Sequence, residues 1–200
     1  MVRKRLELTV HLTNTKAHYG LLAQTVHWLT VVFVAAGWLL GTFLDDFPKN
    51  THGAILVVHM TLGQCVIALL VCRLAWRIAD PPPPPEMTRF GRLQQKAATL
   101  SHVLLYAFLF AVPLAGILVQ LKRGNALPIF GLWDIASPWP ADRATARGIL
   151  KIHEYLANTL VALAGIHAAA ALTHHWVFGD RTLVRMLPAK AQATGRQPMR

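Results

Sequence analysis

The chain has 200 residues, of which 54% are hydrophobic and only 14% are charged, and its net charge is +11. Soluble domains average about 25% charged residues, so this composition excludes an ordinary soluble enzyme and a disordered chain. Two cysteines are too few for a disulfide scaffold or a thiolate zinc module. Because the basic residues flank long apolar runs, the charge indicates a membrane protein rather than one that binds nucleic acid.

Four apolar stretches are long enough to cross a bilayer, which requires about 20 residues. They predict transmembrane helices at Leu21–Leu44, Gly53–Trp76, Ala98–Leu121 and Gly148–Val177. The alternating pattern of barrel strands is absent, so the expected fold is an all-α integral membrane four-helix bundle. We expect an N-terminal arm at residues 1–20, a transmembrane domain at 21–178 and a tail at 179–200.

The distribution of basic residues predicts the orientation. Of the 20 lysines and arginines, 14 lie in the N-terminal segment, the loop between the second and third spans, and the tail. The positive-inside rule therefore places both termini of this multi-pass protein in the cytoplasm, with the bacterial inner membrane as its location.

Two loops have distinctive compositions. Pro81–Pro85 is a run of five prolines, which cannot be helical and is expected to end the second helix. The loop between the third and fourth spans carries Phe130, Trp133 and Trp139 among glycines and prolines. These aromatic residues suit a cap at the outer membrane interface.

Each span contains at least one histidine, and ionisable residues within a membrane are costly enough to be functional candidates. His153 and His167 are 14 residues apart, which on a helix is about 21 Å and a return to within about 40° of the same direction. They therefore share one face at two depths. His59 is expected at the depth of His153, and His27 at the depth of His167.

Two stacked histidine pairs predict two b-type haems in the bundle core, each held between two imidazoles. A zinc or copper site is less favoured because a histidine pair supplies too few ligands. A c-type haem is excluded because the chain has no Cys-x-x-Cys-His. His102 also lies near the inner depth, and it could replace His27 as the partner of His167. Whichever of His27 and His102 is not a ligand would contact a haem propionate or a quinone, or would only be a residue at a helix end.

Further candidates lie at the two membrane surfaces. His174 follows His167 by seven residues and points in nearly the same direction, so it suits a quinone carbonyl. Two arginines lie near the inner ends of the spans, Arg73 and Arg77. They could bind haem propionates, or they could only anchor the helix ends at the membrane surface. On the outer side, a cluster of basic residues could attract a small anion toward the protein. The cluster consists of Lys122, Arg123, Arg147 and Lys151.

Several strings resemble bacterial cytochrome b561. They are Thr25-Val26-His27-Trp28, Val58-His59-Met60, the segment from Ile152 to Asn158 that holds His153, and the segment from Gly165 to His175 that holds His167 and His174. The resemblance runs from about Leu21 to Pro188. The chain departs from the family at the proline run and at its extended N-terminal arm.

The resemblance implies a di-haem b protein whose axial ligands are His27 with His167 and His59 with His153. It favours His27 over His102 and places the quinone-side histidine at His174. Members of the family exchange electrons with ubiquinone and are described as superoxide oxidases. The expected function is therefore that of an oxidoreductase with two haem b groups, oxidising superoxide at the periplasmic side and reducing ubiquinone.

Three alternatives remain open at this stage. The chain could be the haem b membrane subunit that passes electrons between quinone and a soluble dehydrogenase or hydrogenase. It could be a transporter with a histidine relay. It could also be a membrane anchor in which the histidines only bond one helix to another.

Overall fold

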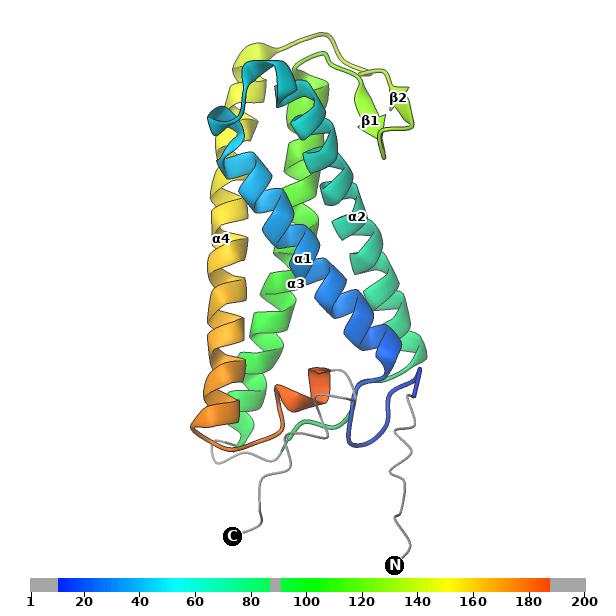
Figure 1. Ribbon diagram of the computed structural model, residues 1–200, viewed down its shortest axis with the longest axis vertical. Helices are drawn as coiled ribbons and strands as arrows, with labels where there is room; N and C mark the ends of the chain where they lie inside the picture. The colour runs from blue at the N-terminus through cyan, green and yellow to red at the C-terminus, as the bar shows by residue number, and fades with distance from the viewer. Residues whose placement is uncertain (1–10, 87–90, 188–200) are drawn as a thin grey trace, which may run out of the picture.

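The computed structural model describes residues 11–86 and 91–187, and these form four long helices with a small hairpin at one end (Figure 1). The helices are α1 (Leu21–Thr42), α2 (His52–Ala79), α3 (Gly91–Lys122) and α4 (Arg143–Trp176). All four are long and apolar enough to cross a membrane. This confirms the predicted four-helix membrane bundle.

The helix ends differ from the predicted spans by more than three residues in two places. The third helix begins at Gly91 rather than Ala98, and the fourth begins at Arg143 rather than Gly148. Both added turns are polar, so hydropathy alone does not detect them. The second helix ends at Ala79, just before the non-helical run Pro81–Pro85, as predicted.

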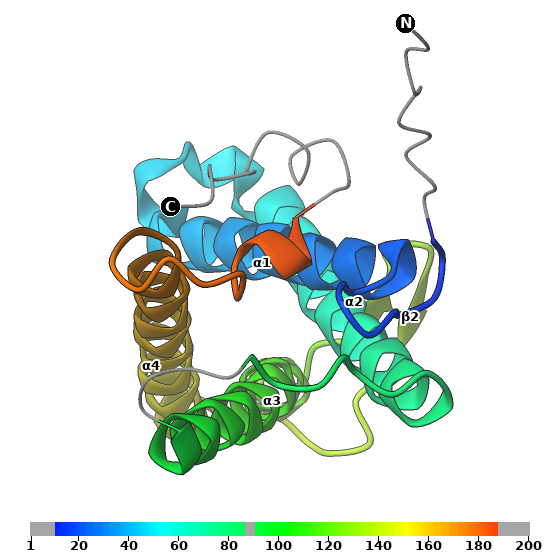
Figure 2. The ribbon, with the colours of Figure 1, turned by 90° about the horizontal axis from the view of Figure 1, so that it is seen from below.

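Consecutive helices run in opposite directions and pack side by side around a common axis. Contacts join α1 to α2, α2 to α3, α3 to α4 and, less extensively, α4 to α1, as the end-on view shows (Figure 2). We call the end with residues 11–20 and the 3-10 helix η3 (Val184–Met186) the proximal end. The opposite end is the distal end; it holds the hairpin and the short 3-10 helices η1 (Leu44–Asp46) and η2 (Lys49–Thr51).

The bundle has a small core and an apolar exterior. Its buried centre consists of Val66, Leu70, Leu109 and Leu160. Many large apolar side chains on the helices face outward instead; Ile166, for example, is 67% exposed. Such an exterior is unusual for a soluble protein. It suits a membrane, where lipid acyl chains cover the apolar surface and keep water away from it.

The loop between α3 and α4 contains two short antiparallel strands, β1 (Leu127–Ile129) and β2 (Trp133–Ile135). The sequence predicted an interfacial cap here but no strands. Phe130 and Gly131 both have positive φ, 50° and 69°, and Leu132 donates its backbone N–H to Ile129 O at 3.0 Å. The left-handed conformation costs a residue such as Phe130 about 1–2 kcal/mol, which glycine avoids.

At the proximal end, one arginine ties three distant segments together. Arg185 is 6% exposed, and its guanidinium donates to Ala17 O at 3.1 Å and to Pro84 O at 3.0 Å. Nearby, Arg181 donates to His18 Nε2 at 2.7 Å. Burial, together with the positive charges of Arg181 and Arg185, lowers the pKa of His18 below its usual value.

The predicted division into arm, transmembrane domain and tail stays a prediction. Residues 1–10 and 188–200 lie outside the described residues, and so do the basic residues that the orientation argument counted there.

Candidate functional site

The distal half of the bundle brings two predicted haem ligands face to face. The rings of His59 on α2 and His153 on α4 have centroids 6.0 Å apart and planes at 79°. The depth argument from the sequence predicted that these two residues lie at one level. Both helices start at the distal end and run in the same direction, so each places its histidine about two to three turns from its first residue.

Each of these rings is anchored through one nitrogen. His59 Nδ1 donates to Gly37 O on α1 at 2.9 Å, and His153 Nδ1 donates to Val112 O on α3 at 2.9 Å. A carbonyl oxygen can only accept, so each Nδ1 carries the proton and each Nε2 has a free lone pair. In metal-bound histidines, a hydrogen bond of this kind from the nitrogen that does not bind the metal fixes the tautomer and the ring orientation.

Two glycines allow the rings to lie this close to neighbouring helices. A Cβ added at Gly41 would lie 3.1 Å from His59 Cε1, and one added at Gly116 would lie 3.2 Å from His153 Cε1. Both distances are tighter than ordinary van der Waals contact. Any larger residue at either position would therefore push a histidine ring from its place.

The space around the two rings fits a b-type haem. A cavity of about 670 Å³, counted out to its open rim, is lined by the two histidines and apolar residues of all four helices. A metal–imidazole bond is about 2 Å long and the ring centre lies about 1 Å farther, so two imidazoles bound to opposite sides of one metal have centres about 6 Å apart. The observed separation matches that value. The free Nε2 atoms supply the required ligand chemistry.

The proximal half gathers three histidines rather than two. His102 on α3 and His167 on α4 have ring centroids 5.4 Å apart. His27 on α1 accepts a hydrogen bond at Nδ1 from Arg73 at 3.0 Å and lies with its ring against Trp28. The structure thus brings His102 into ring contact with His167, which the sequence had considered as the alternative to His27.

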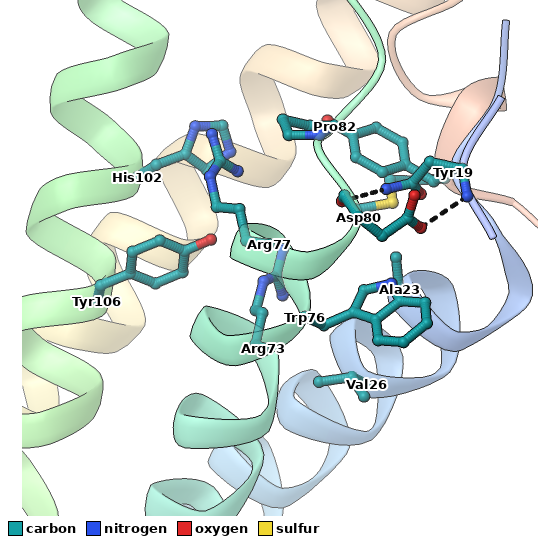
Figure 3. Close-up of a pocket in the computed structure, with 12 residues that line it drawn as sticks. Tyr19, Ala23, Val26, Arg73, Trp76, Arg77, Asp80, Pro82, His102 and Tyr106 are labelled. Carbon is teal, nitrogen blue, oxygen red and sulfur yellow. Dashed lines mark hydrogen bonds between the residues drawn. The ribbon is translucent and has the colours of Figure 1, made fainter. Parts of the chain in front are cut away.

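A second cavity, of about 520 Å³, lies beside this cluster between α1, α2 and α3 (Figure 3). Arg73, Arg77 and Trp76 line it from α2. Trp76 Nε1 is buried and has no hydrogen-bond acceptor among the described residues. Two guanidinium groups and an unpaired N–H fit a carboxylate, which is the charged group that a haem propionate presents.

Tyr106 on α3 was not anticipated from the sequence. It lines the same cavity, and Arg73 lies over its ring with the guanidinium carbon 5.7 Å from the centroid. The hydroxyl of Tyr106 points toward the two arginines in Figure 3. Its only sequence signal was its position four residues after His102, on the same helix face.

The predicted quinone histidine has two polar partners at the proximal end of α4. His174 Nδ1 donates to Asp180, and Gln94 donates to His174 Nε2 at 2.8 Å. Burial raises the pKa of Asp180, but hydrogen bonds from His174 and Thr182 outweigh burial and hold that pKa below its usual value. The sequence analysis did not single out Asp180 or Gln94.

The basic residues at the distal end are spread over two helices. Lys122 ends α3, and its ammonium lies 4.7 Å from the centroid of the Trp139 ring. Lys151 and Arg147 are exposed on α4, and Arg123 follows α3. Acidic residues share this end, so the positive charge is local rather than a uniform field; they include Asp45, Asp46, Asp134 and Asp142.

Known proteins resemble this chain along nearly its whole length. The family model described as prokaryotic cytochrome b561 matches residues 18–189. Cytochrome b561 homolog 1 of Escherichia coli K12 is 35% identical over 82% of this chain and 94% of that protein. Cytochrome b561 homolog 2 of the same organism is 30% identical over 88% of this chain and 94% of its own length.

A third relative carries a name for an activity. The probable superoxide oxidase CybB of Yersinia pestis is 28% identical over 86% of this chain and 97% of that protein. The match to the family model and the sequence identity to these relatives are consistent with a four-helix membrane bundle that has histidines in its core. The chain therefore belongs to the prokaryotic cytochrome b561 family of electron-transferring membrane cytochromes with b-type haem.

Proposed function

We propose that this chain is a di-haem oxidoreductase that takes electrons from superoxide at its distal end and reduces ubiquinone at its proximal end. The observation that carries the proposal is the His59–His153 pair, whose ring centroids are 6.0 Å apart and whose Nδ1 atoms are both engaged by backbone carbonyls. In this reading the protein lies in the bacterial inner membrane, with the distal end in the periplasm and both termini in the cytoplasm.

In the distal half, His59 and His153 would hold one haem through Nε2. Gly37 O and Val112 O accept from the two Nδ1 atoms, which fixes the orientation of both imidazoles and increases their basicity as ligands. The apolar walls of the cavity exclude water from this region. A bound b-type haem supplies one-electron redox chemistry, and the chain tunes it through ligation, burial and nearby charge.

In the proximal half, we assign the second ligand pair to His27 and His167. The family resemblance and the matched depths support this choice. Arg73 and Arg77, with the unpaired Trp76 Nε1, would hold propionate carboxylates. His102 is the alternative ligand because its ring contacts that of His167.

At the proximal surface, His174 Nε2 would hydrogen-bond a ubiquinone carbonyl, which would replace its contact with Gln94. The carboxylate of Asp180 accepts from His174 Nδ1, so this pair can carry a proton from the cytoplasmic side to the quinone. Because hydrogen bonds from His174 and Thr182 hold the pKa of Asp180 below its usual value, its carboxylate is charged at neutral pH and remains an acceptor for His174 Nδ1.

At the distal surface, Lys122, Arg123 and Lys151 would attract the superoxide anion. Their ammonium and guanidinium groups lie at the end where the His59–His153 cavity is closest to water. Asp142 lies beside Lys122, since its backbone N–H donates to Lys122 O at 2.8 Å. We therefore expect attraction over a short range rather than a long one.

The test begins with a dithionite-reduced minus oxidised spectrum of the purified protein, with haem counted per chain. The proposal expects b-type bands and about two haems per chain. Ubiquinone reduction is then followed during a steady supply of superoxide, with a His59→Gln variant as the control. Absence of haem removes the proposal. A haem protein that reduces quinone only with a soluble protein donor would instead be an electron-transfer subunit.

A further inference from the structure

The hairpin formed by β1 and β2 presents an unusually apolar surface. Residues 126–133 contain no charged side chain. Leu127 is buried and Ile129 is partly buried, whereas four other large side chains of the hairpin are exposed. The exposed fractions are 44% for Phe130, 74% for Leu132, 58% for Trp133 and 51% for Ile135.

One side chain of α2 fastens this hairpin to the bundle. Gln64 Nε2 donates to Pro128 O at 2.6 Å, and Gln64 Oε1 accepts from the backbone N–H of Phe130 at 2.8 Å. The amide of Gln64 thus pairs with the outer edge of β1 as a peptide unit of a third strand would. Pro128 lacks an N–H, so the outer edge of β1 has no donor at residue 128 that would need a partner.

The points of attachment lie within the membrane-spanning part of α2. Residues 53–72 contain no Lys, Arg, Asp or Glu, and as a helix they rise about 30 Å, the thickness of the hydrocarbon layer. Gln64 is well inside this stretch. Gly131 also lies against it, because an added Cβ there would be 3.3 Å from Val57 Cγ1. The hairpin therefore lies beside the distal half of α2 (Figure 1), at a depth that the uncharged stretch assigns to a lipid leaflet.

We propose that the tip of the hairpin, residues 129–133, enters the distal leaflet of the bilayer and that Phe130, Leu132 and Trp133 contact lipid acyl chains. Asp134, the charged residue of β2, stays on the side of the polar interface. An open strand edge is not tolerated in lipid unless its polar groups are paired, and Gln64 pairs those of the outer edge of β1. Tryptophan suits this position because its indole is apolar but can reach the polar interface. The proposal requires only that the bundle spans the membrane, and it does not rest on haem or on any substrate.

The hairpin also packs on two of the helices that form the distal cavity. Gln64 lines the cavity that holds His59 and His153, and β1 contacts both α2 and α3. Polypeptide rather than lipid therefore closes this seam of the bundle. Loss of the Gln64 hydrogen bonds would free the hairpin and open that wall.

The test uses the full chain in lipid nanodiscs, with Cys65 and Cys72 replaced by alanine. A nitroxide is attached at Leu132→Cys, and a matched label is attached at Asn50→Cys in the exposed connection between α1 and α2. Collision with oxygen, which concentrates in lipid, is compared with collision with a water-soluble nickel chelate. We expect the oxygen-to-nickel ratio to be several-fold higher at position 132 than at position 50.

Two results would overturn the proposal. Nickel access at position 132 equal to that at position 50 would place the hairpin in water. Protection from both reagents would mean that protein, such as a second copy of the chain, covers it. In a second comparison, Gln64→Leu should lower the oxygen-to-nickel ratio at position 132 toward the value at position 50, whereas Gln95→Leu should leave it unchanged. An unchanged ratio in Gln64→Leu would refute the role of Gln64.

Discussion

The imidazoles of His59 and His153 do not depend on a ligand for their orientation. His59 is already held by a hydrogen bond to a backbone carbonyl of α1, and His153 by a hydrogen bond to a backbone carbonyl of α3. Such a bond contributes about 1 kcal/mol to stability, and it also removes ring rotation that binding would otherwise have to restrict. The distal site is thus preorganised by contacts made within the chain.

The proximal site differs because three histidines compete for two positions. We predict that His27→Gln lowers the haem content from two per chain to about one, whereas His102→Gln retains about two. The reason is that His27 and His167 are matched in depth and lie in strings that resemble the family; ligation through His27 Nε2 would require the ring to give up its Nδ1 hydrogen bond from Arg73. The measurement is a haem assay per chain, with His59→Gln as a reference for loss of the distal group. The reverse pattern would assign His102 as the ligand.

At the scale of elements, α4 contributes one histidine to each site because 14 residues return nearly to the same face. The other helices contribute carbonyls and glycines that fit around the rings. Gly116 on α3 is such a point of close approach, with its would-be Cβ 3.2 Å from His153 Cε1. Gly148 on α4 has no atom within 4 Å of an added Cβ.

This contrast yields a second prediction. Gly116→Val should displace the His153 ring and reduce the haem content from two to about one per chain. Gly148→Val introduces the same β-branched residue into a helix, with a similar small change in helix propensity, but should keep both haems. Haem content and thermal unfolding of both variants provide the check. Equal loss of haem in the two variants would show that helix propensity, not contact with His153, is responsible.

At the scale of the whole molecule, the membrane separates two charged ends by far more than the Debye length of about 8 Å. Charges at one end therefore have little effect on reactions at the other. Lys122 and Arg123 belong to the distal end, whereas Arg92 and Lys96 are exposed near the proximal start of α3. These pairs carry the same charge at opposite ends.

A third prediction follows for the proposed superoxide reaction. Replacing Lys122 and Arg123 by glutamine should lower the rate with superoxide a few-fold at low ionic strength and weaken its salt dependence. Replacing Arg92 and Lys96 by glutamine removes the same net charge but should leave that rate unchanged. Stopped-flow measurements over a range of salt concentrations would decide. If both double variants behaved alike, steering by Lys122 and Arg123 would be disproved.

The sequence by itself determined the four membrane spans, because long uncharged runs have no stable place except in lipid. It also determined the depths of the histidines, since depth depends only on helix rise. The polar first turns of α3 and α4 escaped prediction because they carry no hydropathy signal. The strands β1 and β2 escaped it because Gln64, which pairs with β1, lies more than 60 residues away in the chain.

Only the tertiary structure decided which rings meet. Depth arguments place His27, His102 and His167 at one level, but the rotation and tilt of each helix select the pair in contact. Packing also decided that carbonyls of α1 and α3, rather than side chains, hold the distal imidazoles. These features depend on distances between helices, which no single helix encodes; the bundle sets them when its four apolar surfaces pack together.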